Sequence, residues 1–128
     1  MLWDTSVFID YLRNSTVAAY HLDLVQTGTL EGFCSVITEA ELWAGNRDSE
    51  EELRAAAALS YFTVIPVDTN IARLAGNLLN RKCSGEKRAH FRDALIAATA
   101  IQLGETILTA DKGSESVFGD NANYHIYS

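Results

Sequence analysis

Short segments rich in strand-forming residues alternate with longer helical segments along this sequence, and that alternation limits the folds open to it. The expected strands cover residues 1–3, 32–37, 62–67, 106–108 and 124–127. The expected helices cover residues 6–13, 16–26, 38–45, 70–82 and 93–103, with a further helix that begins at Ser49. Because strands joined by helices of about ten residues form right-handed crossovers, the pattern predicts an α/β protein. We expect a three-layer α/β/α domain with a mostly parallel sheet of about five strands.

Length and composition bound the domain organisation. The chain has 128 residues, 48% of them hydrophobic, so we expect residues 1–128 to form a single domain with its own core. No apolar run approaches the roughly 20 residues that a membrane span needs. Met1 is not followed by the basic and then apolar stretch of a signal peptide. We therefore expect a cytoplasmic protein in which Cys34 and Cys83 are free thiols.

Four acidic residues stand where a strand is expected to give way to a helix. They are Asp4, Glu41, Asp93 and Asp111. The carboxyl ends of parallel strands share one edge of the sheet, so we expect the four side chains to meet there. Several carboxylates in one place are hard to keep ionised without a cation, and hard oxygen ligands suit Mg²⁺ or Mn²⁺. The arrangement indicates metal-dependent chemistry on phosphodiesters.

Each acid also has an ordinary structural interpretation. Asp4 and Asp93 could cap helices, and Asp111 could be a turn residue before a glycine. Glu41 could complete a capping box that begins at Thr38. Four such roles would have to coincide at one edge of the sheet by chance, and this favours a site.

The helix that carries Glu41 offers a second acid, Glu39. Leu42 and Trp43 place the inward-facing side of this helix near Glu41. Glu41 is therefore the preferred candidate, and Glu39 is its competitor.

The distribution of charge bears more on partners than the net charge of −7, which alone argues against a nucleic-acid binder. Five of the ten Lys and Arg residues fall between positions 81 and 92, directly before Asp93. They are Arg81, Lys82, Lys87, Arg88 and Arg92. The segment is either a solvated loop or a rim that steers phosphates towards the acids.

The sequence around each acid forms a short motif. DTSVFIDYLR begins at Asp4, Glu41 opens a Glu-Leu-x-x-Gly segment, and DALIAATA and LTAD contain Asp93 and Asp111. In their order and spacing, over almost the whole chain, these motifs resemble the PIN domain family, specifically the VapC-type toxin ribonucleases. The resemblance implies a PIN-like nuclease domain.

The resemblance also implies roles for individual residues. The catalytic and metal-binding acids would be Asp4, Glu41, Asp93 and Asp111. Ser6 and Thr109 match the small hydroxyl positions that support the site. After Asp111 the chain departs from the family, in which a further acid and an aromatic residue often follow, so Glu115 is the alternative to Asp111.

What the protein does and binds follows from the same resemblance. We expect an endoribonuclease toxin that depends on Mg²⁺ or Mn²⁺, hydrolyses tRNA, rRNA or mRNA, and is inhibited by a VapB-like antitoxin. We also expect a homodimer. The antitoxin would insert a C-terminal segment into a groove beside the first helices. Tyr20, Leu24 and Val25 could line that groove, or they could be core residues.

The residues leave two other functions open. A catalytically weak PIN-like module could bind RNA or a protein without cleaving anything. A metal-dependent phosphatase with an aspartyl nucleophile would need a second Asp two residues after Asp4, but Ser6 occupies that position.

Overall fold

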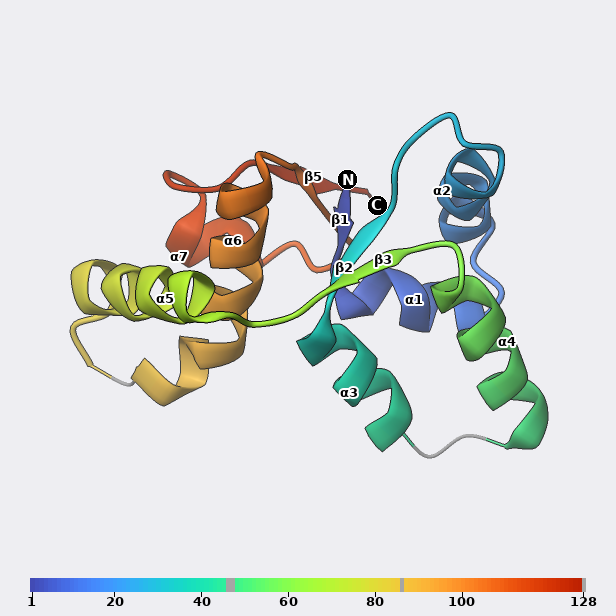
Figure 1. Ribbon diagram of the computed structural model, residues 1–128, viewed down its shortest axis with the longest axis horizontal. Helices are drawn as coiled ribbons and strands as arrows, with labels where there is room; N and C mark the ends of the chain where they lie inside the picture. The colour runs from blue at the N-terminus through green and yellow to red at the C-terminus, as the bar shows by residue number, and fades with distance from the viewer. Residues whose placement is uncertain (46–47, 86, 128) are drawn as a thin grey trace.

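The fold is built on a parallel β-sheet that lies between two groups of helices (Figure 1). The computed structural model describes residues 1–45, 48–85 and 87–127. Within these ranges the strands form a five-stranded sheet in the order β3-β2-β1-β4-β5, and every neighbouring pair is parallel. The strands are β1 (Leu2–Trp3), β2 (Phe33–Ser35), β3 (Thr63–Ile65), β4 (Ile107–Thr109) and β5 (Tyr124–Ile126). The predicted α/β class is confirmed.

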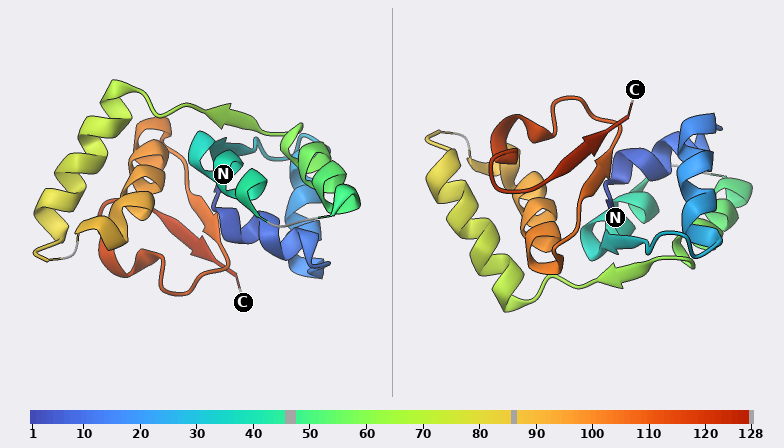
Figure 2. Two further views of the ribbon diagram at one scale, coloured as in Figure 1. Left: turned by 90° about the horizontal axis from the view of Figure 1, so that it is seen from below. Right: turned by 90° about the horizontal axis from the view of Figure 1, so that it is seen from above.

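Helices cover both faces of the sheet and complete the three layers. One face carries α1 (Thr5–Leu12), α2 (Thr16–Gln26), α3 (Val36–Ala44) and α4 (Ser49–Leu59). The other carries α5 (Thr69–Lys82), the 3₁₀-helix η1 (Lys87–His90), α6 (Phe91–Leu103) and α7 (Glu115–Phe118). Figure 2 shows α5 and α6 side by side, away from α1 to α4. None of the helices in the described ranges is long and apolar enough to cross a membrane.

The side chains of the central strands alternate between the two faces, as the geometry of a strand requires. Leu2 and Ile107 pack in one core with α5 and α6. Trp3 and Leu108 pack in a second core with α1, α2 and α4. Because both faces of β1 and β4 are covered, Leu2, Trp3, Ile107 and Leu108 are all apolar, and only Thr109, at the end of β4, is polar.

The strand order reverses between β1 and β4. The chain runs from β1 outward through β2 to β3 and then returns to β4 on the other side of β1. Trp3 pairs with Leu108 across this point, and the backbone N–H of Asp4 donates to the carbonyl of Leu108 at 2.8 Å. Parallel sheets bind ligands at the carboxyl ends of the strands where the order reverses, and Asp4 lies there.

The second strand ends earlier than expected, because a serine starts the next helix. The Ser35 hydroxyl accepts a hydrogen bond from the backbone N–H of Ile37 at 3.1 Å, so α3 begins at Val36. Thr38 is consequently a fully buried helical residue, and Glu41 lies in the second turn. The capping-box interpretation of these two residues is wrong.

In the second half of the chain the main differences from expectation concern α6 and α7. The helix α6 begins at Phe91, directly after η1, so Asp93 lies in its first turn and is not its cap. The short helix α7 was not expected at all. Gly104 ends α6 as predicted, with a left-handed φ of 69°.

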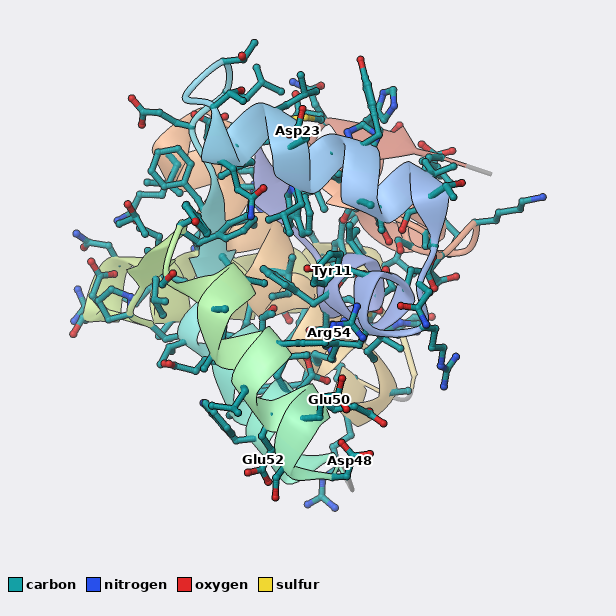
Figure 3. All side chains as sticks on the ribbon, turned by 90° about the vertical axis from the view of Figure 1, so that its right-hand side faces the viewer. Tyr11, Asp23, Asp48, Glu50, Glu52 and Arg54 are labelled. Carbon is teal, nitrogen blue, oxygen red and sulfur yellow. The ribbon has the colours of Figure 1, made fainter. Side chains whose placement is uncertain are left out.

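Arg54 on α4 holds the C-terminal end of α1. Its guanidinium donates to the carbonyls of Leu12 at 3.3 Å and Tyr11 at 3.2 Å, and it lies 5.2 Å from the centre of the Tyr11 ring. Figure 3 shows Arg54 beside Tyr11. These contacts add hydrogen bonds to carbonyls of the last helical turn, where intrahelical partners run out. They fix α1, whose first residue follows Asp4.

Cys34 is expected to resist thiol reagents until the protein unfolds. It is a buried free thiol in β2, and burial together with the charge of Glu39 raises its pKa to about 12. About one thiol in ten thousand would then be ionised at pH 8. Titration of a Cys83→Ser variant with a chromogenic disulfide reagent, with and without guanidinium chloride, measures this. Fast reaction in the folded state would contradict it.

Candidate active site

Asp4 connects β1, α1 and β4. It is the N-cap of α1, where its Oδ1 accepts from the backbone N–H of Thr5 at 2.8 Å. Its Oδ2 accepts from the hydroxyl of Thr109, at the end of β4, at 2.9 Å. The residue is only 6% exposed. Asp4 is therefore a helix cap and also lies at the edge where the acids were expected to meet.

A chain of hydroxyl groups surrounds this point. Ser6 Oγ lies 3.2 Å from Thr109 Oγ1 and accepts from the backbone N–H of Ala110 at 3.0 Å. Thr109 Oγ1 also accepts from the N–H of Asp111 at 3.1 Å, and it lies 3.1 Å from Ser114 Oγ. Ser6 and Thr109, the two predicted supporting residues, thus hold the backbone that leads to Asp111. Ser114 was not predicted.

Glu41 reaches the same edge from α3 and is held by a buried threonine pair. Its Oε1 accepts from the hydroxyl of Thr5 at 2.7 Å. Thr5 Oγ1 lies 3.0 Å from Thr38 Oγ1, and both threonines are buried. Sequence reasoning missed both, because a hydroxyl beside a helix start is normally interpreted as a cap.

Arg92 lies between three of the four predicted acids. Its Nη2 donates to Asp4 Oδ1 at 2.6 Å and its Nη1 to Asp93 Oδ1 at 2.9 Å. Its Nε contacts both oxygens of Glu41, at 2.8 and 2.7 Å. Burial alone would lower the pKa of Arg92, but the hydrogen bonds and charges of Glu41 and Asp4 raise it overall. This residue was expected on an RNA-binding rim, and the structure places it among the acids.

The pKa of Asp93 is raised above its ordinary value. Burial raises its pKa, and the charges of Asp4 and Asp111 raise it further, while Arg92 opposes the shift. Its side chain is 41% exposed, so it faces the opening of the site. A second positive charge here would stabilise its ionised form.

The fourth predicted acid, Asp111, makes fewer contacts with the site than the other three. Asp111 is exposed, and its Oδ1 accepts from the backbone N–H of Gly113 at 2.9 Å, as in an ordinary turn. Its charge nevertheless acts on Asp93. Glu115, in the first turn of α7, is also exposed. Both residues stay candidates for the fourth acid.

A cavity of about 10 Å³ lies between Asp4 and Asp93. Its other lining residues are Ile96, Ile107, Ser114 and Tyr124. This is about the room that one water molecule needs. Burial raises the pKa of Tyr124, and the charges of Asp93, Asp4 and Glu115 raise it further, so this phenol stays protonated. Tyr124 was not predicted, although it begins the strand next to β4.

The donor set suits a small divalent cation, but the side chains are arranged around Arg92. In the part of the chain that the structure describes, no group of three or more His, Cys, Asp or Glu is placed to hold a metal ion. Mg²⁺ is commonly held by one or two carboxylates, with waters in its remaining positions. Asp4 and Asp93 meet that requirement, because both line the same small cavity.

The remaining basic residues lie on the surface at the end of α5 and in η1. Arg81, Lys82, Lys87 and Arg88 are all exposed. Lys82 is 3.5 Å from Asp120, and Lys87 donates to Asn80 at 3.4 Å. The segment therefore keeps four exposed positive charges on the elements that lead into α6.

Thr5→Val is expected to destabilise the protein and to weaken any activity of Glu41. The substitution keeps the shape but removes a buried hydroxyl that serves Glu41 and Thr38. We expect a loss of about 1–2 kcal/mol in the free energy of unfolding. Urea denaturation measures it, with Thr5→Ser as the control that keeps the hydroxyl. Equal stability of the two variants would show that the hydroxyl contributes nothing.

The family model described as the PIN domain matches residues 1–117. The chain belongs to the PIN domain family. Two curated relatives are named Ribonuclease VapC19, from Mycobacterium tuberculosis strains CDC 1551 / Oshkosh and ATCC 25618 / H37Rv. Each is 35% identical over 123 residues, which cover 93% of this chain and 94% of the relative.

Solved structures share the fold at lower sequence identity. A toxin-antitoxin complex from Klebsiella pneumoniae contains a chain with a TM-score of 0.75 and 24% identity, covering 97% of this chain and 94% of that one. VapBC2 from Rickettsia felis, bound to a promoter DNA fragment, gives a TM-score of 0.77 and 16% identity, covering 99% of this chain and 98% of that one. These likenesses concern the fold alone.

Proposed function

We propose that this chain is a metal-dependent endoribonuclease, the toxin of a toxin–antitoxin pair. The observation that carries the proposal is the meeting of Asp4, Glu41 and Asp93 where the strand order reverses. The 35% identity to proteins named ribonuclease VapC19, over 93% of this chain, supports RNA as the substrate. We propose that residues 1–128 act as one nuclease domain.

The roles of the acids follow from where they lie. Asp4 and Asp93 would hold Mg²⁺ or Mn²⁺, with Glu41 and Asp111 acting directly or through water. A bound divalent cation supplies an acidic water and a positive charge opposite the phosphate. Thr5 orients Glu41 and Thr109 orients Asp4 through the hydrogen bonds described above. Hydrolysis by water would leave a 5′-phosphate and a 3′-hydroxyl.

The exposed basic residues before α6 would draw the RNA backbone to this edge. Arg81, Lys82, Lys87 and Arg88 offer positive charge on a protein whose net charge is −7. Such charges act mainly on phosphates and lose effect as salt rises. RNA binding should therefore weaken with ionic strength.

The partner we propose is a VapB-like antitoxin, and structural neighbours described as toxin-antitoxin complexes support it. Of the three residues expected to line its groove, Tyr20 is 56% exposed on α2 and is available for contact. Leu24 is partly buried, whereas Val25 belongs to the core with Trp3. Tyr20 is thus the strongest of these candidates. A homodimer is part of the same proposal.

Incubation of purified protein with total tRNA and rRNA tests the proposed activity. Parallel samples contain Mg²⁺, Mn²⁺ or EDTA. Discrete products with 5′-phosphates that require the metal would support the proposal. A folded protein that binds RNA but neither binds metal nor cleaves would instead be the catalytically weak binding module.

A further inference from the structure

Three carboxylates that come from different parts of the chain are joined by one side chain. Asp4, Glu41 and Asp93 each accept a hydrogen bond from the guanidinium of Arg92, at distances between 2.6 and 2.9 Å. We propose that Arg92 is the internal counter-cation of the metal-free site and competes with the divalent cation for these carboxylates. This inference rests on the proposed metal-dependent function.

The charges explain why such a counter-cation is needed. Asp4 is almost fully buried, and Glu41 and Asp93 are partly so. Carboxylates held together in this way repel one another and are costly to keep ionised. A guanidinium offers donors in a planar fork, so one Arg92 can serve all three acids.

The geometry explains why Arg92 and a cation compete. Asp4 and Asp93 line the cavity that fits a small ion. The Oδ1 of each also accepts from Arg92. A divalent cation that used these oxygens would place two positive charges a few ångströms from the guanidinium, so the two would repel. Binding of the metal must therefore weaken or break at least two of the Arg92 contacts.

Arg92 is able to leave without disturbing the core. Its side chain is 34% exposed, and it projects from the first turn of α6, next to η1. A long side chain at the surface can turn its head into water while its stem stays in place. The apparent metal affinity is then the intrinsic affinity of the carboxylates reduced by the stability of the Arg92 contacts.

Mn²⁺ binding to metal-stripped protein tests this competition. The variants are Arg92→Gln, Arg92→Lys and, as a matched control, Arg88→Gln, which removes one exposed charge four residues earlier. Titration calorimetry at fixed salt should give Arg92→Gln an affinity at least about 10-fold above wild type. Arg88→Gln should stay within about 3-fold of wild type, because its charge acts only at a distance. Arg92→Lys, which keeps the charge without the fork, should fall between them.

Thermal unfolding of the same proteins gives a second readout. In EDTA, Arg92→Gln leaves three carboxylates without a counter-cation, so its melting temperature should fall by at least about 5 °C. Saturating Mn²⁺ should close most of that gap, since the metal replaces the missing charge. A residue with only a structural role would leave the gap equally wide in both conditions.

The outcomes separate this inference from the proposed function. If wild type binds Mn²⁺ and Arg92→Gln binds it no better than Arg88→Gln does, the competition is overturned and the metal-dependent function stands. The competition is also overturned if the melting temperature of Arg92→Gln stays as far below wild type in Mn²⁺ as it is in EDTA. If neither wild type nor any variant binds Mn²⁺, the metal-dependent function fails, and the inference fails with it.

Discussion

Asp93→Asn is expected to reduce RNA cleavage by at least about 100-fold, because even outer-shell partners of a metal site are worth about 10- to 100-fold. Asn keeps an oxygen that can accept from Arg92, so the contact at 2.9 Å can survive. The substitution removes a carboxyl group whose pKa is raised by burial and by the charges of Asp4 and Asp111. The fold should therefore stay intact. Initial cleavage rates at saturating Mg²⁺ measure the effect.

A matched variant controls for loss of negative charge. Asp23→Asn changes an exposed aspartate on α2, a helix that carries none of the four predicted acids (Figure 3). It should cleave at the wild-type rate. Thermal unfolding in EDTA checks the fold. The melting temperature of Asp93→Asn should be no lower than that of wild type. Wild-type cleavage by Asp93→Asn with metal present would remove Asp93 from the site.

Phe8→Ala is expected to cost about 3–5 kcal/mol in the free energy of unfolding. Phe8 is 1% exposed and its ring centre lies 4.9 Å from those of both Trp3 and Phe62. The three rings pack together and connect β1, α1 and the residue before β3 in one core. Since domains are stable by only about 5–15 kcal/mol, this loss is a large share of the total. Urea denaturation followed by circular dichroism measures it.

The control for this prediction is an aromatic residue of the same type on the surface. Phe91 is 56% exposed at the start of α6. Phe91→Ala should change the free energy of unfolding by less than about 1 kcal/mol. If Phe8→Ala were as mild as Phe91→Ala, the ring cluster would not be a principal source of stability.

The fold was predictable from the sequence because burial leaves a local pattern. Leu2 and Trp3 face opposite sides of the sheet, and both are apolar because helices cover both faces. Strand ends were predicted less well. Ser35 ends β2 by capping α3, and such a serine looks the same in sequence whether it continues a strand or starts a helix.

The candidate site was predictable only where each residue could be recognised from its own segment. Asp4, Glu41 and Asp93 follow that rule, and the structure brings them together. The position of Arg92 depends on where α6 begins and on what faces its first turn. In the sequence it is one of five similar basic residues, and its place directly before Asp93 is the one local feature that sets it apart from Arg88.

The pairing of β1 with β4 also bears on how the protein is made. The hydroxyl that positions Asp4 belongs to Thr109, 105 positions later in the chain. During synthesis the central strand β1 therefore leaves the ribosome long before its neighbour β4. A nascent chain that has not yet reached β4 carries its first acid without the partner that orients it. We therefore expect RNA cleavage only from chains long enough to include β4, and none from N-terminal fragments that end before it.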